Sequence, residues 1–428
     1  MAVFGTSSVL GPVIGGFLAG QDSLLGITGW RWIFYVNVPL GLLAFVVVMR
    51  VLHLPHTRRE HRIDWPGALA LVVALVPLLI VAEQGRTWGW DSGRALLCYA
   101  IGVVGLIGFI LAERAYGDDA LLPLRLFRNR SFAVGSVGSI VLGAGMFGGI
   151  LLLPQYLQIV HGSSPTVAGL QMIPLVAGIM IGAMGSGIAI SKTGKYKIFP
   201  LVGIVFIVAA LVSMSFIIDA DTSVWTLVPF MVLLGLGLGF NMQPVILAVQ
   251  NAVSPREIGV ATSSVTFFRQ MGGTIGTAAF LSIMFSRLGT EIPEQIRAAA
   301  QASPEAAQQA AALQQAGAES VLADTSAIDS FPALVMPFRV GFSNTLDLVF
   351  LVAAAVVAIG FFVLWFLPQL ELRTQSGIQA QQAAAAQAPD AVPPAGERTP
   401  QEEVAHAAGA TAPTSTAPPA GTAEDPRG

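Results

Sequence analysis

Long apolar runs alternate with short polar segments along most of the chain. Six runs contain no Asp, Glu, Lys or Arg: residues 95–112, 131–160, 165–191, 198–218, 222–254 and 348–370. Each reaches the length of about 18 apolar residues that a helix needs to cross a bilayer. Shorter runs occupy residues 2–19, 33–49 and 66–82, and Arg269 interrupts the run 258–286. The pattern predicts an all-α integral membrane protein with ten transmembrane helices.

Two segments break this pattern. Residues 287–343 are rich in Ala and Gln, and we expect them to form a long outward loop. Within it, Ser303, Pro304 and Gly317 mark the cap, the first turn and the end of a short helix. Residues 371–428 are rich in Pro, Ala, Thr and Gln and hold few large apolar residues. This composition predicts a disordered tail.

Composition and charge support a membrane protein and give its orientation. Of the 428 residues, 54% are hydrophobic and 11% are charged, whereas soluble domains carry about 25% charged residues. Twelve Lys and Arg residues fall in alternate short loops, and only three fall in the other short loops. Because cytoplasmic loops carry the excess of positive charge, we expect both termini in the cytoplasm. The protein is then a multi-pass protein of the plasma membrane.

Motifs of enzymes and metal sites are absent from the sequence. It contains no Gly-x-x-x-x-Gly-Lys-Ser/Thr, His-Glu-x-x-His or Gly-x-Ser-x-Gly motif. The single cysteine, Cys98, excludes an intrachain disulfide and any cysteine-based metal site. We therefore expect no enzyme, no cofactor, no metal and no nucleic-acid partner. The expected partners are the lipid bilayer and a small-molecule substrate, and an ion gradient is a simpler energy source than ATP.

Two glycine-rich motifs recur eight spans apart. "GPVIGG" lies in the first span and contains Gly11, Pro12, Gly15 and Gly16. "GGTIGT" lies in the ninth span and contains Gly272, Gly273 and Gly276. Small residues four positions apart give a flat face for close helix contact in lipid, and a proline can kink its helix. The motifs indicate either tight packing alone or a bent helix at the interface between two moving halves. The offset indicates parallel halves with two extra helices between them.

Polar residues inside the spans are the candidate substrate path. Arg269 lies near the middle of its span, where a charge costs about 2.5–3.5 kcal/mol on insertion scales. We expect it to face a cavity and bind an anionic group or polar neighbours, and an internal contact between helices is the alternative. Four amides also lie within spans: Gln155, Gln158, Asn241 and Gln243. Each needs a partner in lipid, either another helix or a water-filled cavity.

Four stretches resemble one transporter family. "VLGPVIGGFLAG" (Val9–Gly20) is similar to the antiporter motif on the fifth helix of the major facilitator superfamily. Three others resemble the fourteen-helix drug:proton antiporters, the EmrB/QacA-type subfamily: Gly29–Gly41, Leu153–Pro174 and Ser254–Ala278. They match, in order, the junction of helices five and six, the ninth-to-tenth region and the twelfth-to-thirteenth region. The resemblance covers the chain to about residue 370.

The resemblance implies a major-facilitator fold without its first four helices. Residues 1–52 would hold the last two helices of the N-terminal half (about 2–19 and 33–51), and residues 53–113 a cytoplasmic loop and two linker helices (about 66–83 and 95–112). Residues 114–370 would form a complete C-terminal half, with helices at about 132–159, 166–190, 198–218, 225–250, 259–285 and 346–368. The family's proton-coupling positions on helices one and four would be missing with those helices.

The loop "GSGIAISKTGKYK" resembles the second copy of the family's gating motif. Lys192, Gly194 and Lys195 fit it, whereas Ser191 stands where the motif has an acid. The resemblance implies efflux of small amphipathic or drug-like compounds, coupled to protons, by alternating access. Two alternatives stay open. In the first, the chain is a truncated membrane fragment or scaffold that supports no efflux alone. In the second, another chain supplies the missing helices.

Overall fold

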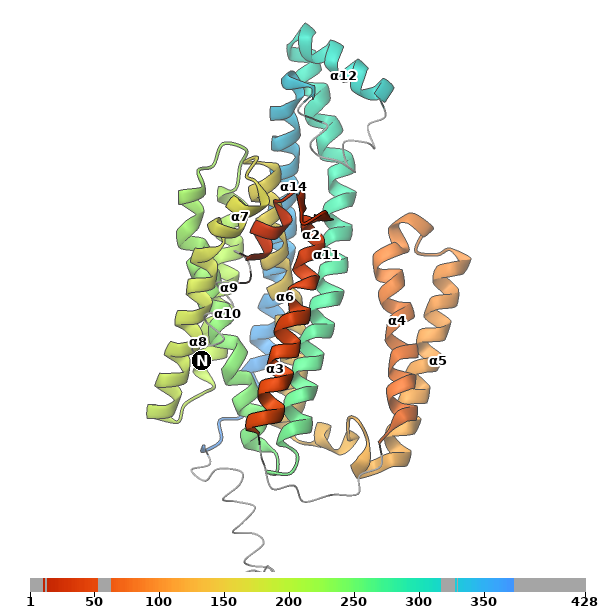
Figure 1. The fold of residues 1–428 in the computed structure, drawn as a ribbon, viewed down its shortest axis with the longest axis vertical. Coiled ribbons are helices and arrows are strands. Elements are labelled where there is room, and N and C mark those ends of the chain that lie inside the picture. The colour runs from red at the N-terminus through yellow and green to blue at the C-terminus, as the bar shows by residue number, and fades with distance from the viewer. Residues whose placement is uncertain (1–10, 12–13, 53–62, 317–327, 329, 373–428) are drawn as a thin grey trace, which may run out of the picture. The chain divides into compact units, whose positions relative to one another are not determined.

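Helices make up nearly all of the regular structure. The computed structural model describes residues 11, 14–52, 63–316, 328 and 330–372 (Figure 1). Most of the first expected span, the loop 53–62 and the tail beyond Leu372 therefore lie outside the described residues. Residues 14–19 of the first span are helical.

A small hairpin follows the first helical segment. Strand β1 (Ser23–Leu24) pairs antiparallel with β2 (Ile27–Thr28). The two residues between them, Leu25 and Gly26, have φ values of 51° and 76°, the left-handed backbone that two-residue hairpin turns favour. The indole Nε1 of Trp32 donates a hydrogen bond of 2.8 Å to Leu24 O. Strands this short leave no alternating pattern that the sequence could show.

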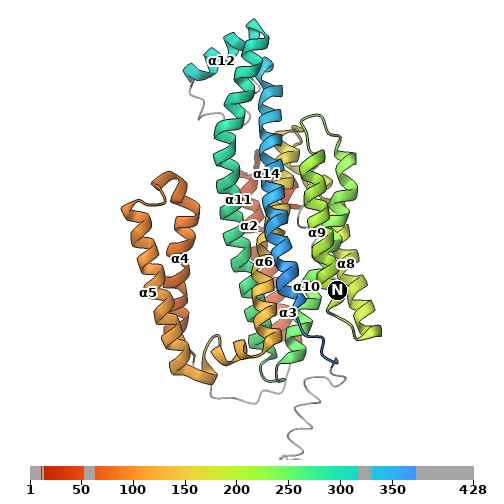
Figure 2. The ribbon, with the colours of Figure 1, turned by 180° about the vertical axis from the view of Figure 1, so that it is seen from behind.

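The first helices after the hairpin are α2 (Gly29–Tyr35), α3 (Asn37–Val51), α4 (Trp65–Trp88) and α5 (Gly93–Tyr116). Helices α4 and α5 run side by side in both views (Figures 1 and 2). Side-chain caps fix their starts, because the Asp64 carboxylate accepts from Gly67 N–H and the Ser92 hydroxyl from Ala95 N–H. Two short 3₁₀ helices follow, η1 (Gly117–Asp119) and η2 (Leu124–Arg128).

The remaining helices form one packed group. They are α6 (Arg130–Ile159), α7 (Pro165–Gln171), α8 (Ile173–Thr193), α9 (Ile198–Ile217), α10 (Val224–Ala252), α11 (Ile258–Ala302), α12 (Pro304–Ala316) and α14 (Pro332–Trp365). Helix α6 packs against α10, α11 and α14, and α10 also packs against α8 and α9. The core of the group is apolar, with Phe132, Leu152 and Phe350 fully buried.

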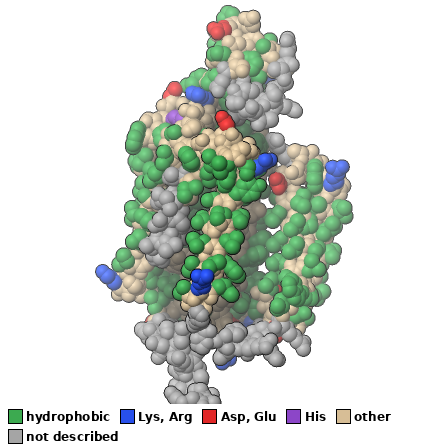
Figure 3. Space-filling view, viewed as in Figure 1, with side chains coloured by type: hydrophobic (Ala, Val, Ile, Leu, Met, Phe, Trp, Pro, Cys, Tyr) green, Lys and Arg blue, Asp and Glu red, His purple; other side chains and the backbone are tan. Residues whose placement is uncertain are grey.

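Eight helical segments of the described ranges are long and apolar enough to cross a membrane. They are α2 with α3, α4, α5, α6, α7 with α8, α9, α10 and α14. Helix α11 is not among them, because Thr, Ser and Gly residues and Arg269 lower its apolar character. Hydrophobic side chains cover much of the visible helix surface (Figure 3), as lipid contact requires.

The segment 287–343, expected as an outward loop, is largely helical. Helix α11 continues without a break to Ala302, α12 follows, and α14 begins at Pro332. Helix α12 lies where the sequence predicts a short helix. Charged residues end the apolar pattern after residue 286, but Ala, Gln, Glu and Arg all favour helix in water, so the helices extend beyond their apolar parts.

Candidate functional site

Arg269 and Asn241 lie on different helices and line one small cavity. Arg269 is on α11 and Asn241 is on α10. The other lining residues come from α6 and α10: Ser139, Leu142, Met146, Leu238, Met242 and Val245. The cavity volume is about 10 Å³, which is room for roughly one water molecule. The structure thus brings together two of the five polar residues that the sequence singles out.

The backbone geometry of α6 explains how Arg269 reaches this position. Gly143 on α6 faces the backbone of α11, and a Cβ there would collide with Arg269 O and lie 3.0 Å from Gly273 N. A glycine at this point therefore lets the two helix backbones approach closely. The close approach places Arg269 beside α6 and α10.

The cavity carries one cation and one open acceptor. Asn241 is 4% exposed, and its Nδ2 donates a hydrogen bond of 2.8 Å to Gly237 O on its own helix. Its Oδ1 is buried and accepts no hydrogen bond from the described part of the chain. Arg269 is half-buried and forms no ion pair within those ranges. A guanidinium donates only and an amide oxygen accepts only, so Arg269 can bind an anionic or accepting group and Asn241 Oδ1 a donating group of the same dipolar molecule.

The three glutamines do not join this cavity. Gln155 and Gln158 are half-buried on α6, several turns beyond Met146, and Gln243 is half-buried on α10 next to Met242. None of them lines the space around Arg269. Their role in a substrate path stays a prediction.

The second glycine motif lies in the contact between α11 and α6. A Cβ added at Gly272 would collide with Ile140 O, and one at Gly273 with the Phe147 ring. At Gly276 an added Cβ would lie 2.6 Å from Ala144 Cα. These glycines therefore allow close packing inside the C-terminal group of helices. A further role at an interface between moving halves stays a proposal.

The first glycine motif meets the C-terminal group at one residue. Thr166 on α7 donates a hydrogen bond of 3.0 Å from its hydroxyl to Gly16 O, and a Cβ at Gly16 would lie 2.6 Å from Pro165 O. Gly11 and Gly15 have no heavy atom within 4 Å of an added Cβ. Pro12 lies outside the described residues.

The residues expected from the gating motif lie at the end of α8 and in the loop that follows it. Gly194 caps α8 with φ of 70°, and its N–H donates to Ile190 O at 2.8 Å. This left-handed conformation favours glycine at a helix end. Lys192 and Lys195 are exposed on either side of it. The Ser191 hydroxyl donates to Ile188 O on its own helix, and within the described ranges it links α8 to no other element.

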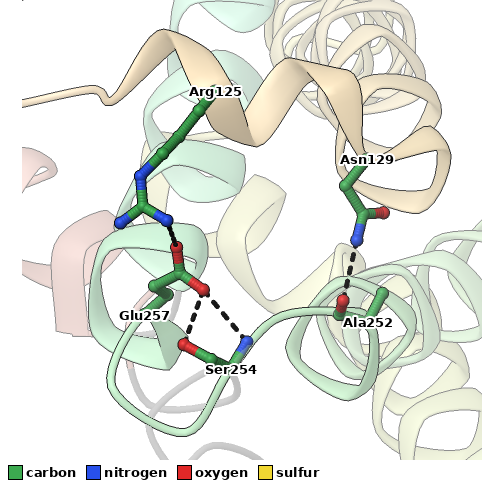
Figure 4. Close-up of polar contacts among 5 residues, drawn as sticks. All are labelled: Arg125, Asn129, Ala252, Ser254 and Glu257. Carbon is green, nitrogen blue, oxygen red and sulfur yellow. Dashed lines mark hydrogen bonds and ion pairs between the residues drawn. The ribbon is translucent and has the colours of Figure 1, made fainter. Parts of the chain in front are cut away.

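A polar cluster that the sequence did not indicate joins η2 to the turn between α10 and α11 (Figure 4). Arg125 pairs with Glu257 at 2.8 Å, and the Ser254 hydroxyl donates to Glu257 Oε2 at 2.6 Å. Asn129 Nδ2 donates to Ala252 O at 2.7 Å. The pKa of Glu257 is lowered, and the hydrogen bond from the Ser254 hydroxyl is the largest cause. Burial raises the pKa in part, and the charge of Arg125 lowers it further.

Asp347 is another polar residue that the sequence analysis did not single out. It lies inside α14, and its Oδ1 is buried with no hydrogen-bond partner in the described ranges. Asp219, between α9 and α10, is close enough to interact with it electrostatically. Tyr156 on α6 donates to the backbone oxygen of Asp219 at 2.7 Å. In the sequence, Asp347 is visible only as a carboxylate directly before the apolar run 348–370.

Comparisons with known proteins give one consistent family. The model of the Major Facilitator Superfamily matches residues 1–277. A tetracycline resistance determinant of Streptomyces rimosus is 36% identical over 73% of this chain and 93% of its own length. An uncharacterized MFS-type transporter of Mycobacterium tuberculosis is 33% identical over 87% of this chain and 51% of its own length.

Another relative is also matched over only about half of its own length. The multidrug transporter protein MdtP of Bacillus subtilis is 32% identical over 69% of this chain and 53% of its own length. The chain thus spans about half the length of these last two relatives. Among solved structures, a bacterial homologue of the human lysosomal transporter Spinster covers 88% of this chain and 87% of its own, with a TM-score of 0.45 and 15% identity.

Proposed function

Since the chain belongs to the Major Facilitator Superfamily, we propose that it is a proton-coupled exporter of small amphipathic or drug-like compounds, and not an enzyme. It exchanges protons for these compounds by alternating access in the cell membrane, with both termini in the cytoplasm. The observation that carries the proposal is Arg269, a cation that lines one cavity with the open acceptor of Asn241, where α6, α10 and α11 meet. Names of the relatives, a tetracycline resistance determinant and a multidrug transporter, support the substrate class.

In this proposal the small cavity is the closed form of the substrate path. Its volume of about 10 Å³ is far below the roughly 300–1,000 Å³ of small-molecule sites. A substrate therefore enters only after α10 and α11 separate. The apolar neighbours, such as Leu142 and Met146, contact the body of the compound, and Arg269 binds its polar group.

An efflux assay tests the proposal. The 428-residue chain is expressed alone in a bacterium that lacks its own drug exporters, and the loss of radiolabelled tetracycline from preloaded cells is followed with and without a protonophore. We expect the cells to lose the compound, and we expect the protonophore to abolish this loss. Arg269→Gln should slow the loss about tenfold, which corresponds to about 1.4 kcal/mol. Gln270→Ala is the matched control, because Gln270 is exposed beside Arg269. Efflux that is insensitive to the protonophore would contradict proton coupling.

One observation favours a second candidate, in which another polypeptide completes the transporter. None of the residues of α3 is buried, although α2 with α3 is apolar enough to cross a membrane. An additional group of helices would cover this surface. If the chain alone, detected in the membrane fraction, exports no tetracycline, this candidate predicts a purified complex with a second chain of several apolar spans. A single active 44.7 kDa chain would overturn it.

A further inference from the structure

A groove of about 310 Å³ lies where α8 and α14 end and α9 begins. Its lining residues are Lys195, Lys197, Ile198, Leu201, Trp365 and Gln369. Two lysines and an apolar wall therefore line one groove, and no carboxylate of the described residues lines it. A ligand that matches it has an anionic part and an apolar part.

Hydrogen bonds fix the backbone of the turn that carries the two lysines. The Gln369 amide connects both ends of the turn, because its Nε2 donates to Gly194 O and its Oε1 accepts from Lys197 N–H, each at 3.0 Å. Tyr196 is fully buried between the lysines, and its hydroxyl donates to Pro368 O at 2.9 Å and accepts from Leu370 N–H at 2.8 Å. The turn is thus preorganised, which lowers the entropic cost of binding.

The apolar wall faces away from the helix bundle. Ile198 and Trp365 are each 57% exposed, although both belong to helices that are apolar enough to cross a membrane. Tryptophan is enriched at the boundary between lipid and water. Lys197 Nζ lies 6.0 Å from the centroid of the Trp365 ring, so a cation and an aromatic side chain are neighbours in the groove.

We propose that this groove binds an anionic phospholipid, with the headgroup phosphate between Lys195 and Lys197 and one acyl chain along Ile198, Leu201 and Trp365. Lysine binds phosphate as a point charge, and basic pockets at the ends of membrane helices attract anionic headgroups. A free phosphate ester would use the lysines only. The exposed apolar wall is the reason to assign a lipid, and the assignment is independent of what the protein transports.

Native mass spectrometry of the purified full chain in detergent tests the proposal. The protein is titrated with dioleoyl phosphatidylglycerol or with dioleoyl phosphatidylcholine, and bound lipid is counted. We expect tighter binding of the anionic lipid, and an affinity loss of about fivefold for each of Lys195→Gln and Lys197→Gln. The double substitution to Arg keeps the charge and retains binding. Lys192→Gln is the matched control, because Lys192 is exposed near the same turn but does not line the groove.

Two further experiments, a substitution of Trp365 and a competition with glycerophosphate, distinguish a lipid from a soluble phosphate ester. Trp365→Ala is expected to weaken phosphatidylglycerol binding, and glycerophosphate at the same concentration is expected not to displace the lipid. Displacement by glycerophosphate would overturn the assignment to lipid. Equal binding of the two lipids by the unmodified chain, or unchanged phosphatidylglycerol binding by the double Gln variant, would overturn the site. None of these readouts depends on transport, so a chain that exports nothing can still confirm the site.

Discussion

At the residue scale, the Glu257 carboxylate links η2 to the turn between α10 and α11. Its bonds to Ser254 and Arg125 lower its pKa below the ordinary value of 4.5. A lowered pKa in the folded state contributes stability above the unfolded pKa, and this contribution is lost as the pH falls through the folded value. We expect Glu257→Gln to lower the free energy of unfolding at pH 7 by about 1 kcal/mol, since Arg125 is half exposed and screened by water.

The measurement is thermal unfolding of the detergent-solubilised protein at neutral and acidic pH. The difference between wild type and Glu257→Gln should shrink below pH 4.5 as the wild-type carboxylate takes up its proton. Glu294→Gln is the control, because Glu294 is exposed on α11. An equal difference at both pH values would show that the carboxylate charge does not contribute.

Residue chemistry was partly readable from the sequence. Arg269 interrupts an apolar run, so its position at membrane depth is visible in the pattern, and the structure adds that it meets Asn241. Asp347 stands directly before an apolar run and does not interrupt it, so the pattern does not show how far inside a helix it lies; that helix begins fifteen residues earlier, at Pro332. Glu257 and Arg125 are far apart in the chain, and only the fold brings them together.

At the element scale, glycine controls how closely α11 approaches α6. We expect Gly276→Ala to destabilise the protein by about 1–3 kcal/mol, because the new methyl group would lie 2.6 Å from Ala144 Cα and the backbone must move. Gly289→Ala is the matched control on the same helix, since nothing lies within 4 Å of its added Cβ. It should be neutral or stabilise by up to about 1 kcal/mol. Equal melting temperatures of the two variants would contradict close packing at Gly276.

Apolar length predicts where helices cross lipid but not where they end in water. The runs at residues 198–218 and 222–254 correspond to α9 and α10 almost to the residue. Helix α11 instead runs to Ala302, because Ala, Gln and Glu continue a helix after its apolar part has ended. Some helices also break inside an apolar run, at Val36 between α2 and α3 and at Met172 between α7 and α8. Because the residues at these breaks are themselves apolar, hydrophobicity does not reveal them.

At the scale of the whole molecule, α12 and the turn at Lys192 belong to opposite ends of the helices. Helix α12 packs near the start of α14, whereas Ile190 and Tyr196 pack against Leu367 just beyond its end. The excess of Lys and Arg in alternate loops predicts that the Lys192 end is cytoplasmic. Single cysteines introduced in a Cys98→Ser background can therefore report the orientation, because Cys98 is the single native cysteine.

We expect a membrane-impermeant maleimide to label Gln308→Cys on intact cells and to label Lys192→Cys only after the cells are made permeable. Both positions are exposed, on α12 and at the end of α8, so access and not burial decides the outcome. The reversed pattern would place both termini outside. The basic groove at Lys195 and Lys197 would then face the outer leaflet, and the attraction of the anionic inner leaflet would no longer support it.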